Sequence, residues 1–262
     1  MTNIVKTEQN YAVSTVGAVD FADMANELEG LGAITLDNVK VPSGGGITFE
    51  VPSDDPNNPN VEKALTGVVV YHNPLNSYWS KPFTGENEAP DCMSINAKQG
   101  VELATGECRN CLTCPLNKFG DNGEGKKCRN MHRLYILLQG ATMPIVLNVP
   151  PSSLGAFKTY ITKAVLLRGR KLNNVVTQIT LKKAQSKTGI TYSQLQFAKV
   201  GDLTPEQVAE FAPLAELCKT LSMQLPDKSN NDEQELDNII NEAGKEQVLK
   251  DKPIEFENVE TL

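Results

Sequence analysis

The fold of this chain is organised around residues 91–133, DCMSINAKQGVELATGECRNCLTCPLNKFGDNGEGKKCRNMHR. This stretch holds five of the six cysteines, which are Cys92, Cys108, Cys111, Cys114 and Cys128. Thiolates two residues apart on a tight loop can turn inward and share a metal ion, and Zn²⁺ accepts four such ligands in a tetrahedron at about 2.3 Å. We therefore interpret residues 84–132 as a small zinc lobe carried by a larger domain.

Sequence spacing leaves the ligand set open. Cys111 and Cys114 form one C-x2-C knuckle, and Cys128 and Cys92 would complete a site of four thiolates. Cys108 is then a spare, or it replaces Cys111 or Cys92. The histidine four positions past Cys128 is a further candidate ligand, although it is better placed to begin the next strand.

The metal expected in this lobe is a structural zinc ion. An iron–sulfur cluster is the alternative, because C-x2-C-x2-C also occurs in ferredoxins, where a fourth cysteine and a proline follow closely. Here Pro115 follows the third cysteine directly, and the next cysteine lies far along the chain. This spacing favours zinc.

Charge is distributed unevenly along the 262 residues, whose formal net charge is −7. Residues 109–199 contain fifteen Lys and Arg but only two acids, a net charge of +13. Residues 1–108 carry −10, and residues 226–262 carry −7. A basic middle between acidic ends predicts a polyanion site beside a detachable acidic tail.

Short strands separated by glycine turns dominate the middle of the chain. We expect strands over residues 34–41, 47–51, 65–72, 133–139, 144–149, 175–183 and 190–200, the first two forming a hairpin around residues 43–46. Helices are expected over residues 20–31, over residues 154–167 with Ser152 or Ser153 as the cap, and from Thr204 to about residue 221. This pattern predicts a mainly β fold with helices (α+β), as an OB-like barrel with an inserted zinc lobe and a C-terminal helix. A less regular α+β sheet is the alternative.

Three parts of the chain are expected to differ in order. Residues 1–17 form a flexible N-terminus, residues 18–225 form the OB-like nucleic-acid-binding domain, and residues 226–262 form an acidic, largely disordered tail. No apolar run is long enough to span a bilayer, so no membrane partner is expected. The N-terminus also lacks a secretory signal pattern, which predicts a cytoplasmic location.

Cations and aromatic rings in the basic middle, and in the segment 73–83 before it, are the expected nucleic-acid contacts. Single-stranded nucleic acid is held by cations along its backbone and by rings against unstacked bases. The candidates are Tyr78, Trp79, Lys81, Phe83, Lys118, Phe119, Lys126, Lys127, Arg129, Arg133, Tyr135, Arg168, Arg170, Lys171, Lys182, Lys183, Lys187 and Tyr192. For the rings of segment 73–83, packing against the core or the lobe is the alternative.

No sequence pattern indicates catalysis. The chain has two histidines and no Walker, HExxH or GxSxG motif, and its glycine triplet at residues 44–46 joins two expected strands. The basic middle also lacks the carboxylates that a metal-dependent nuclease needs. We therefore do not expect an enzyme.

Residues 111–137, CLTCPLNKFGDNGEGKKCRNMHRLYIL, resemble proteins of bacteriophages and integrated elements. These share a Cys-x2-Cys-Pro-x-Asn segment, a Gly-Lys-x-Cys-x-Asn segment and a following Arg-Leu strand, and the similarity extends over residues 68–200. The resemblance implies Cys92, Cys111, Cys114 and Cys128 as the ligand set, with Cys108 as an extra. The plan of basic barrel, zinc lobe and acidic tail also resembles phage single-stranded DNA-binding proteins, which implies the cytoplasm of a bacterial host cell.

The leading functional hypothesis is a sequence-independent single-stranded DNA-binding protein of phage-type DNA replication or recombination. Its acidic tail is expected to bind replication or recombination proteins, or to cover the basic site until DNA displaces it. Two alternatives are a phage-encoded protein-interaction module that inhibits a host complex, and an iron–sulfur redox protein.

Overall fold

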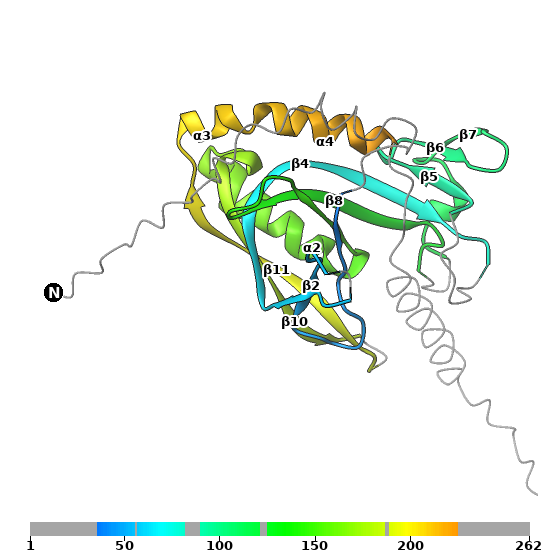
Figure 1. The fold of residues 1–262 in the computed structure, drawn as a ribbon. Helices are drawn as coiled ribbons and strands as arrows, with labels where there is room; N and C mark the ends of the chain where they lie inside the picture. The colour runs from blue at the N-terminus through cyan, green and yellow to red at the C-terminus, as the bar shows by residue number, and fades with distance from the viewer. Residues whose placement is uncertain (1–35, 56, 82–89, 121–124, 187–188, 225–262) are drawn as a thin grey trace, which may run out of the picture.

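The computed structural model describes residues 36–55, 57–81, 90–120, 125–186 and 189–224. These residues form a mixed α+β fold built on one large sheet (Figure 1). The expected helix over residues 20–31, the N-terminal segment 1–17 and the tail 226–262 lie outside the described residues. In the part of the chain that is described, no helix is long and apolar enough to cross a membrane.

The sheet is organised by β4, a fifteen-residue strand from Ala64–Tyr78. One edge of β4 pairs with the antiparallel strand β8 (Arg129–Leu138). The other edge pairs first with β10 (Val175–Gln185) and then with β5 (Cys92–Ser94). A strand covered in this way needs apolar side chains on both faces, and Val68, Val69 and Val70 are indeed buried. β4 therefore ties the cysteine lobe and the C-terminal hairpin to one scaffold.

The remaining strands extend the sheet in the order β1-β9-β8-β4-β5-β6-β7. They are β1 (Asn38–Val39), β9 (Ile145–Val149), β6 (Gln99–Glu102), β7 (Cys108–Asn110) and β11 (Thr191–Asp202), which pairs with β10. A separate two-stranded sheet joins β2 (Phe49–Val51) and β3 (Asn60–Glu62). Over the residues that the structure describes, no closed barrel is detected.

The expected hairpin between residues 34–41 and 47–51 is wrong. β1 pairs in parallel with β9, and β2 pairs with β3. The glycine turn between β1 and β2 packs instead on the β10–β11 hairpin, where Ser193 Oγ donates to Gly46 O at 2.8 Å. Gly45 has a positive φ of 83°, and a Cβ there would meet the Thr191 side chain at 2.5 Å, so both its conformation and its packing favour glycine.

The segment after residue 72 also differs from the expected loop, because β4 continues through Pro74 to Tyr78. Proline removes a backbone donor, so a strand accepts it where one edge is open. At Pro74 that edge lies between the stretch paired with β10 and the stretch paired with β5, and no described strand covers it. The extension matters because it carries Asn76 and Tyr78 into the cysteine lobe.

One face of the sheet is closed by α2 (Pro151–Tyr160), which continues through a π-turn (Ile161–Val165) and a 3₁₀ turn (Leu166–Arg168). The expected serine cap is wrong, because the N-cap is Pro150 and makes no side-chain cap bond. Ser153 Oγ instead accepts the Leu195 N–H at 3.0 Å. This contact satisfies a backbone donor of β11 and fixes α2 against that strand.

The opposite face is covered by α4 (Ala212–Gln224), which follows the short helix α3 (Pro205–Glu210), and Figure 1 shows α4 lying along β4. The expected start of this region is confirmed, since Thr204 and Gln207 form a complete capping box. Its apolar side chains pack against Val68, Val70 and Tyr135 in one cluster. The expected buried thiol is confirmed at Cys218, whose pKa is raised by burial to about 12.

Gly67 lies where β4 is paired on both edges, opposite Leu138 and Thr177. A Cβ at Gly67 would clash with the carbonyl oxygen of Leu137 and lie 2.9 Å from Ile136 Cγ2. Because backbone cannot move aside cheaply, Gly67→Ala is expected to lower the free energy of unfolding by about 1–3 kcal/mol.

Urea denaturation measures this difference, and Gly155→Ala in α2 is the matched control. A Cβ at Gly155 meets nothing within 4 Å. Alanine is the better helix former, so this control should keep or slightly raise the stability. Equal stabilities of the two variants would contradict the close approach inferred at Gly67.

Candidate metal centre and nucleic-acid surface

The cysteine lobe is the connection between β4 and β8. It contains β5, β6, β7 and a 3₁₀ turn (Pro115–Asn117). Two backbone hydrogen bonds connect separate segments of the lobe: the Cys111 N–H donates to Lys98 O at 2.9 Å, and the Cys128 N–H donates to Leu116 O at 2.8 Å. These bonds hold two cysteines from different parts of the lobe at fixed places. Residues 84–89 and 121–124 of the expected lobe lie outside the described residues.

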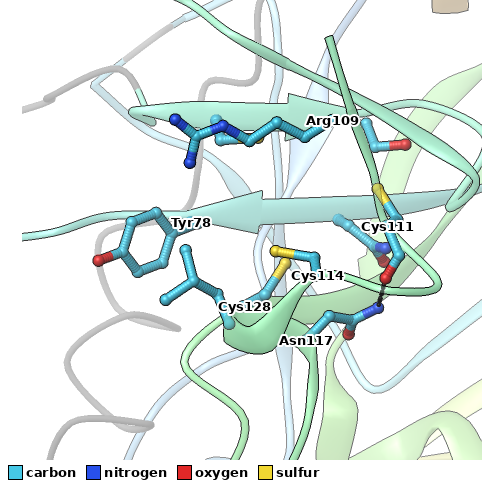
Figure 2. Close-up of a pocket in the computed structure, with 10 residues that line it drawn as sticks. Tyr78, Arg109, Cys111, Cys114, Asn117 and Cys128 are labelled. Carbon is cyan, nitrogen blue, oxygen red and sulfur yellow. Dashed lines mark hydrogen bonds between the residues drawn. The ribbon is translucent and has the colours of Figure 1, made fainter.

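Four cysteines line a single pocket in this lobe: Cys92, Cys111, Cys114 and Cys128. Figure 2 shows three of them around the opening, with Arg109, Tyr78 and Asn117. Gly100 leaves room for the sulfurs, since a Cβ there would lie 3.1 Å from Cys92 Sγ and 3.4 Å from Cys111 Sγ. The pocket thus contains the four cysteines that the resemblance implies.

Two other candidate ligands lie elsewhere. Cys108 is exposed on β7, and its register partner Val101 on β6 is exposed as well. His132 lies on β8 against His72, with its Nε2 2.8 Å from His72 Nδ1. Neither residue lines the cysteine pocket.

The pocket thiols affect one another's ionisation. Burial raises the pKa of Cys128 to about 12, and negative charge on Cys111, Cys114 and Cys92 acts in the same direction. Burial also raises the pKa of Cys92, with Cys111 and Cys114 adding to the effect. Four neighbouring thiolates repel one another, so all four would ionise together only around a cation. This is the electrostatic situation that a bound metal relieves.

Two basic side chains favour thiolates at this pocket. Arg109 lowers the pKa of Cys92, and Lys126 lowers that of Cys128, in both cases against the larger effect of burial. Lys126 is held in place, because its Nζ donates to Asn130 Oδ1 at 2.8 Å and to Asn117 Oδ1 at 3.3 Å. Sequence reasoning assigned Lys126 to DNA and missed this role.

Asparagines brace the pocket and were also missed. Asn117 Nδ2 donates to Cys111 O at 2.8 Å, which holds the first knuckle against the 3₁₀ turn (Figure 2). Asn130 Nδ2 donates to Asn76 Oδ1 at 2.8 Å across the β4–β8 pair. The sequence signal for Asn117 and Asn130 was their place in the Cys-Pro-x-Asn and Cys-x-Asn segments of the resemblance, whereas Asn76 had no such signal.

The chemistry of the pocket fits zinc, which binds four thiolates in closed structural sites. Among the described residues, no group of three or more His, Cys, Asp and Glu side chains stands at metal-bonding geometry. Zinc binding by Cys92, Cys111, Cys114 and Cys128 would therefore require their sulfurs to turn toward a common centre within the pocket.

Several expected DNA contacts lie together on the surface of the lobe. Lys118, Phe119 and Lys127 are exposed, and Lys126 is half-buried. The Lys126 ammonium lies 5.3 Å from the Phe119 ring centroid. The lobe thus presents cations beside an exposed aromatic ring, the combination that binds single strands.

Other expected contacts lie outside the lobe. The exposed cations are Lys81 after β4, Arg168 and Lys171 after α2, and Lys182 and Lys183 on β10, while Tyr78 and Tyr192 are half-buried. Phe83 and Lys187 lie outside the described residues. The exposed cations among the expected contacts therefore fall into at least three groups, in the lobe, after α2 and on β10.

Three expected contacts are buried, which corrects the sequence reasoning. Tyr135 is fully buried in the cluster under α4, so it cannot stack on a base while the fold is closed. Arg129 and Arg133 are only 7% and 4% exposed. Arg129 lies 5.3 Å over the Trp79 ring, and Arg133 Nε donates to Asn148 Oδ1 at 3.1 Å. These arginines stabilise the sheet and add little to its surface charge.

Arg170 is not an uncompensated cation. Its Nε lies 2.7 Å from Asp202 Oδ1, and Lys199 Nζ lies 2.7 Å from the other oxygen of the same carboxylate. The hydrogen bonds from Lys199 and Arg170 lower the pKa of Asp202. Asp202 was overlooked because it follows the basic stretch in sequence, although β11 brings it back to Arg170.

The paired histidines predict an acid-sensitive fold. Burial lowers the pKa of His132 to about 4, and the neighbouring His72 adds to this shift. The unfolded chain takes up a proton near pH 6.5, which the folded chain resists until about pH 4. His132 therefore does not lower the free energy of unfolding above pH 6.5. Below this pH the free energy of unfolding falls as the pH drops toward 4.

Thermal unfolding across this pH range tests that expectation. The wild-type melting temperature should fall more steeply than that of His132→Gln, which has no imidazole to protonate at this position. Protonation of the cysteine pocket affects both proteins, so only the difference between the two curves is informative. Parallel curves would contradict the lowered pKa.

No protein-family model, curated protein or solved structure matches this chain.

Proposed function

We propose that this chain is a non-enzymatic, sequence-independent single-stranded DNA-binding protein of phage-type replication or recombination. We further propose that Cys92, Cys111, Cys114 and Cys128 hold a structural zinc ion. The acidic segment 226–262 would bind replication or recombination proteins, and the protein would act in the cytoplasm of a bacterial host cell.

The observation that carries this proposal is the connectivity of the sheet. β4 and β8 are antiparallel neighbours joined by the cysteine lobe, and β9 pairs with β8. α2 comes next, and the β10–β11 hairpin returns so that β10 pairs with β4. This order supports an OB-like, partly open Greek-key arrangement. β1 pairs with the outer edge of β9, and Ser153 of α2 contacts β11. These two contacts account for the side on which the arrangement stays open.

The positions of the basic groups agree with this interpretation. OB-folds bind oligonucleotides with the loop between strands one and two and the loop between strands four and five. In this chain the first of these connections is the cysteine lobe, with Lys118, Phe119 and Lys127. The second joins β10 and β11 beside exposed Lys182 and Lys183. Both expected binding loops therefore carry exposed cations.

The path of the DNA is expected to differ from a simple OB-fold. The outer face of β4 and β8 is covered by α4, whose buried side chains share a cluster with Tyr135 and Leu137. Displacing α4 would expose this apolar cluster. We therefore propose that DNA follows the lobe and the β10–β11 loop, and that α4 is a fixed part of the fold.

A fluorescence titration with poly-dT tests the proposal. Trp79 is the only tryptophan and lies half-buried at the end of β4, before the lobe. We expect poly-dT to change its emission, with an apparent affinity that falls at least about tenfold between 50 and 200 mM salt. Binding without salt dependence, or no binding at the lower salt, would contradict the proposal.

A protein-interaction module is the second candidate, favoured by two adjacent exposed leucines. Leu166 and Leu167 are 58% and 73% exposed at the end of the helical segment that begins with α2, and neighbouring exposed apolar side chains are typical of contact surfaces. In that case Leu167→Ser would weaken partner binding and leave poly-dT binding unchanged. Loss of partner binding on nuclease treatment would instead favour the DNA hypothesis.

A further inference from the structure

The only two histidines of the chain meet on one face of the sheet. His72 lies on β4 and His132 on β8, where the register partner of His132 is Pro74, two residues from His72. Side chains in such diagonal positions of an antiparallel pair share a face. His72 Nδ1 lies 2.8 Å from His132 Nε2, and the ring centroids are 4.9 Å apart.

We propose that His72 and His132 form a second metal site, a bidentate imidazole chelate for a divalent ion of the Ni²⁺ and Cu²⁺ class. With metal–nitrogen bonds of about 2.0–2.1 Å, nitrogens 2.8 Å apart subtend roughly 85° at the ion. Tetrahedral zinc needs an angle near 109°, whereas tetragonal and octahedral ions take adjacent ligands near 90°. At this hydrogen-bonded spacing the angle is closer to that of tetragonal and octahedral ions than to that of tetrahedral zinc.

The protonation of the pair suits metal binding. Neutral imidazole is the form that binds metal ions, and burial lowers the pKa of both His72 and His132. In the hydrogen-bonded pair one ring donates its N–H to the other. Binding requires that proton to move to the other nitrogen of the same ring, a tautomer change with no net proton release. Both lone pairs can then face one ion.

Packing holds the rings while leaving access to solvent. Phe157 of α2 lies against both histidines, with ring centroids 5.2 Å from His132 and 6.4 Å from His72. His72 is exposed and His132 is half-buried. Two protein ligands leave further coordination positions, which water can fill from the open side. The pair is already in contact, so binding requires the tautomer change and a turn of the rings toward the ion, and no movement of the strands.

Titration of the untagged, full-length, zinc-supplemented chain with Ni²⁺ tests the site, followed by NMR of the two imidazole Hε1 signals. Paramagnetic Ni²⁺ should broaden both signals together at substoichiometric amounts. Chelation adds about 10²–10⁴ to the affinity of one ligand. His72→Gln and His132→Gln should therefore each lower Ni²⁺ affinity at least about 100-fold, and the double variant should also lose the residual affinity of the single imidazole.

The outcomes separate this site from the thiols and from the proposed DNA function. Cys108→Ser should leave the broadening unchanged, because the chelate involves no thiol and Cys108 is exposed outside the cysteine pocket. Broadening of one histidine signal alone, or of neither at equimolar Ni²⁺, would overturn the proposal in the wild-type chain whatever the variants do. Full Ni²⁺ affinity in a folded His132→Gln would also overturn it, since a single exposed imidazole would then suffice.

Discussion

Replacing Cys128 with serine is expected to abolish the zinc binding that we propose for this protein. Cys128 directly precedes β8, and its backbone N–H is already bound to Leu116 O at 2.8 Å. Structural zinc contributes about 10–16 kcal/mol of apparent binding free energy in zinc-finger peptides. Loss of a side chain that only hydrogen-bonds to a metal ligand typically lowers metal affinity about 10–100-fold. Loss of one of the four thiolates themselves should lower zinc affinity by more than this. Metal content should fall from one zinc per chain to near zero.

The matched control for this experiment is Cys108→Ser. Cys108 is exposed on β7 and lies outside the pocket, although only two residues separate it from Cys111. This variant should retain one zinc per chain and the wild-type melting temperature, whereas Cys128→Ser should melt earlier. Zinc loss from Cys108→Ser and zinc retention by Cys128→Ser would contradict the proposed ligand set. A brown chromophore in protein purified without oxygen would favour an iron–sulfur cluster instead.

Phe119→Ala is expected to weaken single-stranded DNA binding about 5- to 150-fold, the equivalent of the 1–3 kcal/mol that stacking one base contributes. The Phe119 ring is 73% exposed at the surface of the lobe, with the Lys126 ammonium 5.3 Å from its centroid. Stacking does not involve phosphate, so the salt dependence of binding should stay unchanged while the affinity falls. Fluorescence anisotropy with labelled poly-dT at several salt concentrations separates the two effects.

Leu112→Ala is the control for this variant. Leu112 is also 73% exposed and belongs to the same lobe, but it has no ring to stack on a base. Its replacement should leave DNA affinity unchanged. Equal losses in the two variants would mean that the lobe contributes general apolar contact, and unchanged affinity in Phe119→Ala would remove the lobe from the proposed DNA path.

Local patterns in the sequence predicted the parts of the fold that depend on neighbouring residues. The β10–β11 hairpin and the capping box at Thr204 are confirmed, because turn and cap chemistry act over a few residues. The pairing of β1 with β9 could not be predicted, since it joins residues more than 100 positions apart. The continuation of β4 through Pro74 was also missed, because it depends on which edge other strands leave open.

The candidate site shows the same difference between local patterns, which the sequence reveals, and contacts between distant residues, which it does not. Spacing identified a cysteine-rich lobe, but the choice among five cysteines depends on strand faces, and β7 turns Cys108 outward. Charge counting also overestimated the basic surface, because burial of Arg129 and Arg133 and the Arg170–Asp202 pair appear only in three dimensions. The contact between His72 and His132, sixty residues apart, had no local signal at all.

Competition between DNA forms distinguishes the proposed preference for single strands from general attraction to phosphate. Labelled poly-dT bound to the full-length protein would be challenged with unlabelled single-stranded and duplex DNA of equal length at the same salt. Single strands should displace the label at far lower concentration than duplex, because only they offer unstacked bases to the lobe. Equal displacement by both forms at low salt would contradict a preference for single strands, since it would reduce the interaction to phosphate charge alone.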